Sequence, residues 1–483
     1  MAFANNYRRY GVALLAAGST AVLLWFGTGL YPLWPLLWLA PLPVLLFSSR
    51  NTGWDTAVAA LLSWFIGSLN LRHYFSAALH MPLSIQALIF LLPALVFMGA
   101  VLLFRALLKR GASWSALLAF PATWVSVEYL CNLVSPHGTG GSLSYSQLNF
   151  LPVLQLASVT GPWGISFVVL LFPAVVAIGM QAGRSGAKQG LRIAGAGLVA
   201  IGLVLIFGMM RLRGQSPVQE VKVGLIASDL AANLDVADAG PDTARLFRDY
   251  AAQAEKLAAR GAQVIVLPEK LGVSVDPDTQ QTDALFQSLA DKTKSEIVVG
   301  LVRVSPPLKY NEARVYAPGA PLHSYDKQHM LPPFESNLKP GTTLTLLREP
   351  SGTWGVAICK DMDFTPLSRQ YGEAGTGLML VPAWDFVLDR FEHGHMAVMR
   401  GVESGFSIVR AAKQGYLTVS DDRGRILAET RSDSAPFAAL LASVPVGHDT
   451  TVYLLWGDWF AWAVLAALVF SLAQLCRSKN RMI

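Results

Sequence analysis

Long apolar stretches alternate with short polar connections over the first 210 residues, and another apolar stretch lies near the carboxyl end. Most approach or exceed the roughly 20 residues that an α-helix needs to cross a bilayer. The pattern predicts eight membrane-spanning helices, near residues 10–28, 31–48, 54–78, 85–108, 114–134, 160–183, 191–210 and 452–475. The second stretch is rich in proline, so we expect a broken or tilted helix there.

The composition agrees with a membrane protein. Hydrophobic residues make up 53% of the 483 residues and charged residues only 14%, and the mean hydropathy is +0.42. Soluble domains carry more charge than this. The net charge of +6 follows from basic residues that sort to the cytoplasmic side of a membrane, and we therefore expect no nucleic-acid partner.

The basic residues indicate an orientation. They fall in alternate connections of the eight-span pattern, at Arg8, Arg9, Arg50, Arg105, Lys109, Arg110, Arg184, Lys188, Arg192, Arg477, Lys479 and Arg481. The opposite connections, near 28–31 and 135–160, contain no Lys or Arg. By the positive-inside rule both termini are cytoplasmic. Seven spans precede residue 215, so the segment that follows is expected outside the cytoplasm.

Three parts result: a transmembrane bundle over 1–214, a soluble domain over 215–447, and an eighth span with a cytoplasmic tail over 448–483. In the soluble part, short apolar runs alternate with helical stretches. Strands are predicted at 221–227, 263–268, 296–304, 355–359 and 378–382, and helices at 242–260 and 282–294. This alternation is typical of a layered α/β domain.

One cysteine of the soluble part is a candidate nucleophile. The chain has three cysteines, Cys131, Cys359 and Cys476, too few for a disulfide framework or a cysteine metal site. Cys359 ends an apolar strand, and Asp361, Asp363 and Thr365 are expected to cap a helix that follows. The positive end of such a helix favours the thiolate. The alternative interpretation is an ordinary buried core cysteine.

Two further residues suit the same chemistry. Glu269 ends the apolar run at 263–268, and Lys327 precedes an apolar loop that contains prolines. A carboxylate takes the thiol proton, the thiolate attacks a carbonyl, and an ammonium holds the resulting oxyanion. Taken singly, either residue is more often a solvated surface group.

These residues resemble a known superfamily. Leu267-Pro-Glu269, Tyr325-Asp-Lys327 and Ile358-Cys359 are similar, in this order, to the Glu–Lys–Cys triad of nitrilases, or carbon–nitrogen hydrolases. The resemblance implies an α-β-β-α sandwich with Glu269 as general base, Lys327 as oxyanion stabiliser and Cys359 as nucleophile. Joined to eight spans, such a domain resembles the bacterial apolipoprotein N-acyltransferase family, where Glu335 stands in the place of an accessory catalytic glutamate.

That family resemblance implies a reaction and a location. A fatty acyl chain passes from a phospholipid, typically phosphatidylethanolamine, to the cysteine as a thioester. It then passes to the amino-terminal amine of diacylglyceryl-cysteine on a lipoprotein. The expected protein is a monomer in the bacterial inner membrane, with its catalytic domain on the periplasmic side and without metal or other cofactor.

The chain also departs from the family pattern. Where the family has Cys-Tyr-Glu, this chain has Cys359-Lys360-Asp361, and the element at 382–386 differs as well. We expect substrate contacts from Lys360, Met330, Phe334, Trp384 and Phe386. Ordinary packing is the alternative for the apolar residues. Lys360 either lowers the pKa of the thiol or faces solvent.

Two other functions stay open at this point. One is a membrane-tethered amidase, or a transferase that acts on a different amine or lipid; the other is a catalytically silent membrane scaffold. His329 is expected to be structural. The group Arg390, Glu392, His393 and His395 is expected to form a solvated face rather than a metal site.

Overall fold

The computed structural model describes residues 2–214, 219–234 and 236–477. The chain divides into two compact units. Unit 1 contains Met1–Val134, Gly141–Leu212 and Trp456–Ile483, and unit 2 contains Ser135–Gly140 and Arg213–Leu455. Residue 215, the predicted start of the soluble domain, and the basic residues Lys479 and Arg481 lie outside the described residues.

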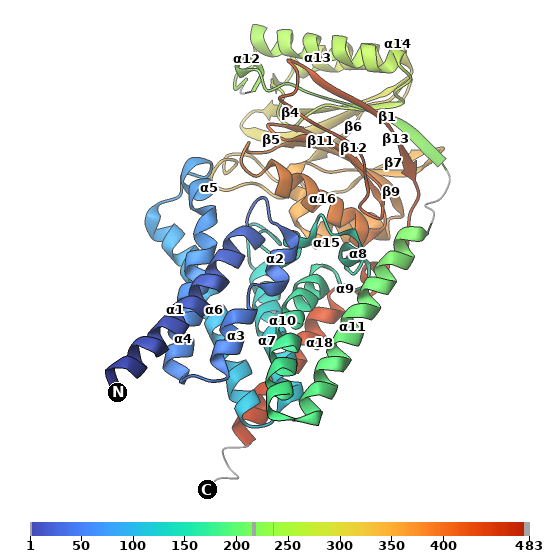
Figure 1. The fold of residues 1–483 in the computed structure, drawn as a ribbon. Helices are drawn as coiled ribbons and strands as arrows, with labels where there is room; N and C mark the ends of the chain where they lie inside the picture. Colours follow the sequence, from blue (N-terminus) through green and yellow to red (C-terminus); the bar gives the residue numbers. More distant parts are fainter. Residues whose placement is uncertain (1, 215–218, 235, 478–483) are drawn as a thin grey trace. The chain divides into compact units, whose positions relative to one another are not determined.

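Unit 1 is helical (Figure 1). Its long helices are α1 (Ala2–Gly27), α4 (Gly53–Ser68), α6 (Leu83–Lys109), α7 (Ser113–Asn132), α10 (Pro162–Ser185), α11 (Lys188–Arg213) and α18 (Trp459–Arg477). Its shorter elements are α2 (Trp34–Leu39), α3 (Leu42–Ser48), η1 (Leu69–Leu71), α5 (Arg72–Ala77), η2 (Leu143–Gln147), α8 (Leu151–Leu154) and α9 (Ala157–Thr160). The break expected in the second apolar stretch lies at Ala40 and Pro41, between α2 and α3.

Five of the described helices are long and apolar enough to cross a membrane: α1, α6, α10, α11 and α18. The other three predicted spans correspond to α4, to α7 and to the broken pair α2 and α3. Helix α4 has 16 residues, fewer than the roughly 20 that a perpendicular span needs. The several apolar helices agree with a membrane protein, and the count of eight spans stays a prediction.

Basic side chains join helix ends within unit 1. Arg105 Nε donates to the carbonyl of Ser48 at 3.1 Å, and its Nη2 donates to the carbonyl of Asn51 at 2.8 Å. Arg110 donates to the carbonyl of Leu475. The ends of α3, α6 and α18 therefore meet.

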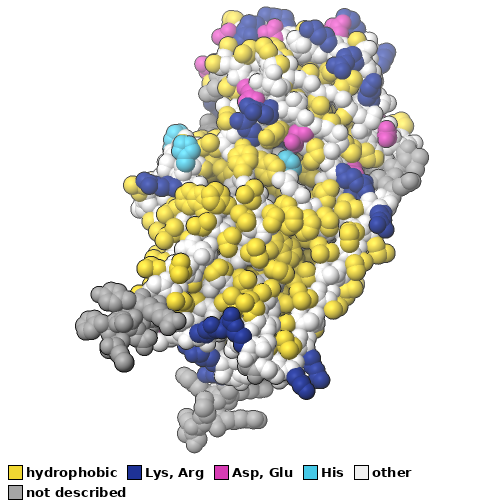
Figure 2. All heavy atoms as spheres, in the orientation of Figure 1, with side chains coloured by type: hydrophobic (Ala, Val, Ile, Leu, Met, Phe, Trp, Pro, Cys, Tyr) yellow, Lys and Arg dark blue, Asp and Glu magenta, His cyan; other side chains and the backbone are white. Residues whose placement is uncertain are grey.

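Figure 2 shows a broad hydrophobic surface over unit 1, with Lys and Arg side chains gathered at its lower edge.

Unit 2 contains two β-sheets. The first has the order β13-β1-β2-β4-β5-β6, with β3 beside β4, and the second has the order β12-β11-β10-β9-β8-β7. The strands of the first sheet are β1 (Gln219–Ala227), β2 (Val264–Val266), β3 (Val273–Val275), β4 (Glu296–Ser305), β5 (Leu308–Tyr316), β6 (His323–Asp326) and β13 (Ala438–Val446). Those of the second are β7 (Thr345–Glu349), β8 (Gly352–Val356), β9 (Thr376–Trp384), β10 (Ser407–Lys413), β11 (Tyr416–Ser420) and β12 (Ile426–Arg431).

Helices cover the outer face of each sheet (Figure 1). The helices of unit 2 are α12 (Ala231–Leu234), α13 (Pro241–Ala259), α14 (Thr279–Thr293), α15 (Thr365–Glu373) and α16 (Arg390–Ser404), and α17 (Val452–Trp456) leads into unit 1. Alternate residues of β1 serve two cores: Val223 and Leu225 pack between the sheets, and Ile226 packs against α13. A third core joins the second sheet to α15 and α16. The predicted α-β-β-α sandwich is confirmed.

The turn after β8 differs from the prediction. A 3-10 turn, η3 (Cys359–Asp363), begins at the cysteine, and α15 starts only afterwards. Asp361 caps η3, because its carboxylate accepts the N–H of Ile358 at 3.1 Å. Helix α15 has no side-chain cap, so the expectation that Asp363 and Thr365 cap it is wrong. A proline in its first turn removes one N–H that would need an acceptor.

Candidate active site

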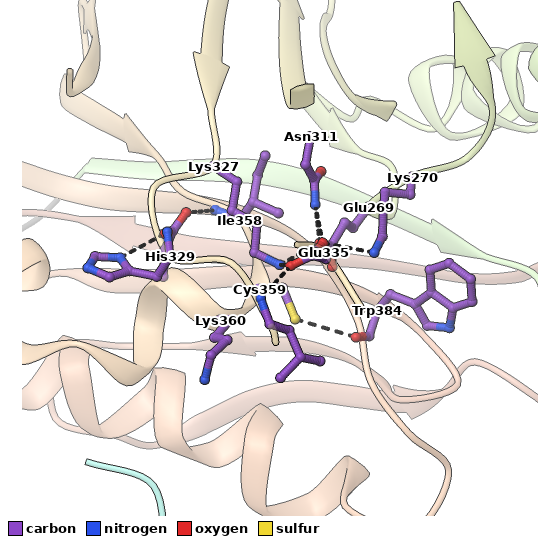
Figure 3. Close-up of polar contacts among 12 residues, drawn as sticks. Glu269, Lys270, Asn311, Lys327, His329, Glu335, Ile358, Cys359, Lys360 and Trp384 are labelled. Carbon is purple, nitrogen blue, oxygen red and sulfur yellow. Dashed lines mark hydrogen bonds and ion pairs between the residues drawn. The ribbon is translucent and has the colours of Figure 1, made fainter. Parts of the chain in front are cut away.

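Lys327, Glu269 and Glu335 form one buried cluster (Figure 3). Lys327 Nζ donates to Glu269 Oε1 and to Glu335 Oε2, each at 2.8 Å. Glu269 follows β2, and Lys327 follows β6 at the edge of the same sheet. The structure thus brings together two residues 58 positions apart in the chain, as the superfamily resemblance implies.

Asn311 and Lys270 complete this cluster, and neither has a predicted role. Asn311 Nδ2 donates to Glu269 at 2.6 Å and to Glu335 at 2.8 Å, and Lys270 Nζ donates to Glu335 at 2.8 Å. The backbone N–H of Leu331 adds a further bond to Glu335, at 2.9 Å. The feature that marks Asn311 as a site residue is its complete burial within β5. Buried amides need partners.

The electrostatics fix the charges of this cluster. Burial disfavours the ammonium of Lys327, but the carboxylates of Glu269 and Glu335 outweigh burial and hold the pKa of Lys327 well above its ordinary value. Burial acts against the Glu335 carboxylate, yet Lys327 and Lys270 lower the pKa of Glu335 to about 2. Lys327 is therefore a cation and Glu335 an anion throughout the neutral range.

Cys359 lies beside this cluster, and its side chain is buried (Figure 3). Its φ of 43° lies in the left-handed region, which costs a non-glycine residue about 1–2 kcal/mol. The thiol donates to the carbonyl of Trp384 at 3.4 Å. On another side, Arg410 Nη2 lies 3.9 Å from Sγ. The strained turn therefore presents the sulfur to the guanidinium of Arg410, on β10.

The resting thiol is protonated. Burial and the negative charge of Glu269 raise the pKa of Cys359 well above its ordinary value, and Lys327 and Arg410 act in the opposite direction. The expectation that a helix end favours the thiolate is therefore wrong for the resting site, because the desolvation of a buried sulfur dominates. A protonated thiol needs a base before it can act as a nucleophile, and Glu269 is the carboxylate whose charge acts most strongly on the thiol.

Lys360 is buried, so its interpretation as a solvent-facing lysine is wrong. Its Nζ lies 3.2 Å from His137 Nδ1 and 3.4 Å from Asp363 Oδ2. Figure 3 shows the side chain directed away from the sulfur of Cys359. Burial and then the Lys360 ammonium lower the pKa of His137. The cation therefore acts on the segment Ser135–Gly140, which belongs to unit 2.

Asp361 connects the turn at the cysteine to the segment after Lys327. Its carboxylate accepts the backbone N–H of Gln328 at 3.2 Å and that of His329 at 2.8 Å. The ring of His329 adds a contact of 3.0 Å from Nδ1 and stacks on Phe364 with 3.7 Å between ring centroids. These contacts agree with the structural role expected for His329.

The apolar residues expected to touch substrate lie around the same cluster. Phe334 is 45% exposed, and its ring centroid lies 5.6 Å from that of Phe386. Met330 is half-buried. The half-buried ring of Trp384 packs under Lys413 Nζ, 3.7 Å from the ring centroid. Contact of these side chains with a lipid stays a prediction.

The histidines of α16 do not form the expected solvated face. His395 is buried, and its Nδ1 lies 2.8 Å from the carbonyl of Phe391. The Nδ1 of His393 lies 3.3 Å from Asp389 and 3.7 Å from Asp385. The sequence pattern alone places these residues on a short charged run, whereas the fold turns the run toward the sheet that carries Cys359.

Comparisons with known proteins agree with this arrangement. Residues 20–175 match the family model of the apolipoprotein N-acyltransferase N-terminal domain, and residues 235–435 match that of carbon–nitrogen hydrolases. An apolipoprotein N-acyltransferase of Geobacter metallireducens is 28% identical, over 92% of both chains. The chain is thus similar to apolipoprotein N-acyltransferases over most of its length.

Further apolipoprotein N-acyltransferases match over nearly their full length. The protein of Nitrosomonas europaea is 24% identical over 97% of both chains, and that of Vibrio cholerae is 24% identical over 94% of this chain and 95% of its own. Among solved structures, Nit3 of Saccharomyces cerevisiae, described as a member of branch 10 of the nitrilase superfamily, is 22% identical with a TM-score of 0.40. That likeness covers 47% of this chain and 92% of Nit3. An amidase of Nesterenkonia is 18% identical with a TM-score of 0.41, over 49% of this chain and 94% of its own.

Proposed function

We propose that this protein transfers a fatty acyl chain from a phospholipid to the amino-terminal amine of diacylglyceryl-cysteine on lipoproteins, through a thioester on Cys359. The likeness to apolipoprotein N-acyltransferases over most of the chain supports the acyl transfer to lipoproteins. The observation that carries the assignment to particular residues is the buried cluster of Lys327 with Glu269 and Glu335 beside a buried thiol. Such a constellation suits nucleophilic acyl transfer.

In the first half of the proposed reaction, Glu269 takes the thiol proton while Cys359 Sγ attacks the ester carbonyl of the phospholipid. The oxyanion of the tetrahedral intermediate is stabilised by the ammonium of Lys327, which is fixed by two carboxylates in advance. The carbon–oxygen bond then breaks, and the lysophospholipid oxygen leaves with the proton held by Glu269. The acyl chain remains on sulfur as a thioester.

In the second half, the lipoprotein amine attacks the thioester carbonyl. Glu269 accepts a proton from the amine, Lys327 again faces the oxyanion, and the carbon–sulfur bond breaks with return of the proton to sulfur. Glu335 stays charged because Lys327 and Lys270 hold its pKa at about 2. Its proposed part is to keep the ammonium of Lys327 in place rather than to carry protons.

The proposed donor is phosphatidylethanolamine, and the proposed enzyme is a monomer in the bacterial inner membrane with unit 2 on the periplasmic side. The distribution of Lys and Arg along the chain supports this orientation. A membrane-embedded enzyme meets both lipid substrates without withdrawing acyl chains into water, a step that costs about 0.8 kcal/mol for each CH₂ group. Phe334 and Phe386 are proposed to contact the donor chain.

The test is a mass measurement on the acyl-enzyme. Purified protein in detergent is incubated with phosphatidylethanolamine of one defined acyl chain, stopped at low pH and digested. The peptide that contains Cys359 is expected to gain one acyl mass, which is lost on addition of a diacylglyceryl-cysteine peptide. Cys359→Ala is expected to show no adduct, while Cys131→Ala keeps it.

Three results would each count against the proposal. An absent adduct, under conditions in which another member of the family forms one, would contradict the acyltransferase function. A thioester that passes to water or to small amines but never to the lipopeptide would indicate a membrane-tethered amidase. Turnover that persists in Cys359→Ala would remove the nucleophile assignment.

A further inference from the structure

A second charged cluster, formed by Arg410 and Asp385, lies beside the thiol. Neither residue has a part in the reaction proposed above. Arg410 Nη2 lies 3.9 Å from Cys359 Sγ. The same guanidinium donates to both carboxylate oxygens of Asp385, at 2.8 and 2.5 Å. Both side chains are buried, so water screens their interaction little. The position of the guanidinium beside the sulfur therefore depends on the Asp385 carboxylate.

His393 lies on the far side of Asp385. Its Nδ1 is 3.7 Å from Asp385 Oδ1 and 3.3 Å from Asp389 Oδ2, and its Nε2 is 3.8 Å from Asp363 Oδ2. These carboxylates come from the residue after β9, the start of α16 and the end of η3. Their contacts to the ring are electrostatic, since Nδ1 has no hydrogen-bond partner within the described residues.

The charges of the carboxylates within 4 Å of the ring and of their cationic partners balance when the ring is protonated. Three carboxylates face two fixed cations, Arg410 and Lys360, of which Lys360 pairs with Asp363 at 3.4 Å. One negative charge is left over, and an imidazolium at His393 neutralises it. The three carboxylates are buried, where uncompensated charge is costly, while the His393 side chain itself is 21% exposed. Protonation of the ring is therefore favoured by the arrangement itself.

The titration of His393 follows this arrangement. Burial disfavours the imidazolium, but the carboxylates of Asp389, Asp363 and Asp385 outweigh burial and raise the pKa of His393. Arg410 opposes them. Burial raises the pKa of the neighbouring Glu392 to about 7, while the charge of His393 lowers it.

The remaining neighbours do not replace the imidazolium. His137 is kept neutral, because burial and then the Lys360 ammonium lower its pKa. Within the described residues, α15 and β11 add no ion pair to the ring. The titratable and charged groups around it are, by element, Asp363 and Lys360 of η3, Asp385 after β9, Asp389 and Glu392 at the start of α16, Arg410 of β10 and His137 of the 135–140 segment.

We propose that His393 is a positioning residue for acyl transfer: as an imidazolium it holds Asp385, and through Asp385 the guanidinium of Arg410, against the sulfur of Cys359. The proposal rests on the proposed function in taking Cys359 as the nucleophile. Loss of the ring proton leaves one excess negative charge near the sulfur. The thiolate is then less stable, and acylation is slower.

The experiment measures the thiol itself, without lipid. The full-length protein in detergent is alkylated with iodoacetamide between pH 6 and 10, and the peptide that contains Cys359 is quantified by mass spectrometry, since Cys131 and Cys476 are exposed and also react. His393→Gln removes the cation, and its alkylation at pH 7.5 is expected to be about tenfold slower, equivalent to one unit in the pKa of the thiol. His393→Arg keeps a cation, and its rate is expected to stay within about threefold of that of the parent protein.

The control is His395→Gln, two residues along the same helix. His395 is buried and contacts Phe391 rather than the carboxylate cluster. The His395→Gln variant is expected to have a lower unfolding temperature than the parent protein and an unchanged alkylation profile. In the unaltered protein, the pH dependence is expected to depart from a single titration curve, which tests the idea without any variant.

Three outcomes would overturn the positioning role. The first is an alkylation rate in His393→Gln equal to that of the parent. The second is an equal slowing in His393→Gln and His395→Gln. The third is a folded His393→Arg as slow as His393→Gln. A missing thioester in the parent protein, together with the expected alkylation pattern, would refute the acyltransferase function and leave the effect of His393 on the thiol standing.

Discussion

The buried carboxylate of Asp361 accepts the hydroxyl of Tyr325 at 2.8 Å. Tyr325 belongs to β6 of one sheet, and Asp361 belongs to the turn that follows β8 of the other. The same carboxylate holds the backbone of Gln328 and His329. A residue that stands out in the sequence as a departure from the family pattern thus ties the segment carrying Lys327 to the turn carrying Cys359.

We expect Asp361→Asn to destabilise the protein and to slow acylation. The variant loses the charge of an acceptor that is used by several donors, and each charged hydrogen bond contributes about 1.5–3 kcal/mol. A loss of about 3 kcal/mol of unfolding free energy is the expected scale. The measurement is the unfolding midpoint in detergent, followed by the rate of thioester formation.

Tyr325→Phe is the matched control for Asp361→Asn. It removes a single donor and leaves the backbone bonds to Asp361 in place, so the expected loss is about 1 kcal/mol. Burial raises the pKa of Tyr325 well above its ordinary value, and the hydroxyl therefore donates at every pH used. Equal losses in the two variants would show that Asp361 does not organise the two segments.

The stability of unit 2 is expected to fall below pH 4.5 through Glu335. The pKa of Glu335 is lowered to about 2 by Lys327 and Lys270, although burial opposes this. A lowered acid pKa contributes stability above the unfolded pKa, near 4.5, and the contribution is lost as the pH falls toward the folded value. The contribution above pH 5 is on the order of 3 kcal/mol.

Glu335→Gln checks this assignment. The variant is expected to be less stable than the parent at pH 7, and the difference is expected to shrink between pH 4.5 and 2. Unfolding midpoints at several pH values in one detergent supply the measurement. A difference that stays constant with pH would mean that Glu335 does not titrate with a lowered pKa. Thioester formation at pH 7 is expected to fall about tenfold, because Lys327 then keeps one carboxylate partner only.

The sequence pattern predicts the site residues that directly follow buried strands. Glu269 and Cys359 each follow an apolar run that the fold buries, and the resemblance of three short motifs to the nitrilase superfamily predicts that they act together with Lys327. The sandwich follows from the same runs. Strand β5 escapes the pattern because its first two residues are exposed and charged or polar residues interrupt its apolar ones, so the pattern does not select Asn311.

Contacts between elements explain the other misses. The direction of the Lys360 side chain depends on His137, which is 223 residues away in the chain. The segment Ser135–Gly140 reads as a connection between two membrane spans, yet it belongs to unit 2. His393 and Asp385 gain a shared neighbour only when α16 packs against β10. No local period in a sequence contains such information, because it arises from the packing of distant elements.

Lys360→Met is expected to act on stability rather than on substrate affinity. Its ammonium is buried against Asp363 and His137, and removal of one partner of a buried pair costs about 3–5 kcal/mol. The KM for phosphatidylethanolamine is expected to stay within about twofold, since the side chain points away from the sulfur. Lys360→Arg keeps the charge and is expected to recover part of the stability. A raised KM with an unchanged unfolding midpoint would instead support the substrate contact predicted from sequence.

Phe334→Ala is expected to impair use of long-chain donors without loss of stability. Its side chain is 45% exposed and contacts Phe386, so its truncation changes the unfolding free energy by about 0.5 kcal/mol or less. Each CH₂ of a donor chain that loses an apolar partner costs up to about 0.8 kcal/mol. The expected result is a several-fold higher KM for a donor with sixteen carbons and an unchanged KM for a short-chain ester.

Ile426→Ala is the control for Phe334→Ala. Ile426 is 38% exposed, similar to Phe334, but it lies on the edge strand β12, away from the cluster around Lys327. The KM of the Ile426→Ala variant is expected to match that of the parent for both the sixteen-carbon donor and the short-chain ester. An exposed apolar residue contributes to lipid binding only where the acyl chain passes. A rise in KM for the short-chain ester in Phe334→Ala would place the defect in the chemistry at Cys359. An equal rise for the long-chain donor in both variants would remove the proposed acyl contact.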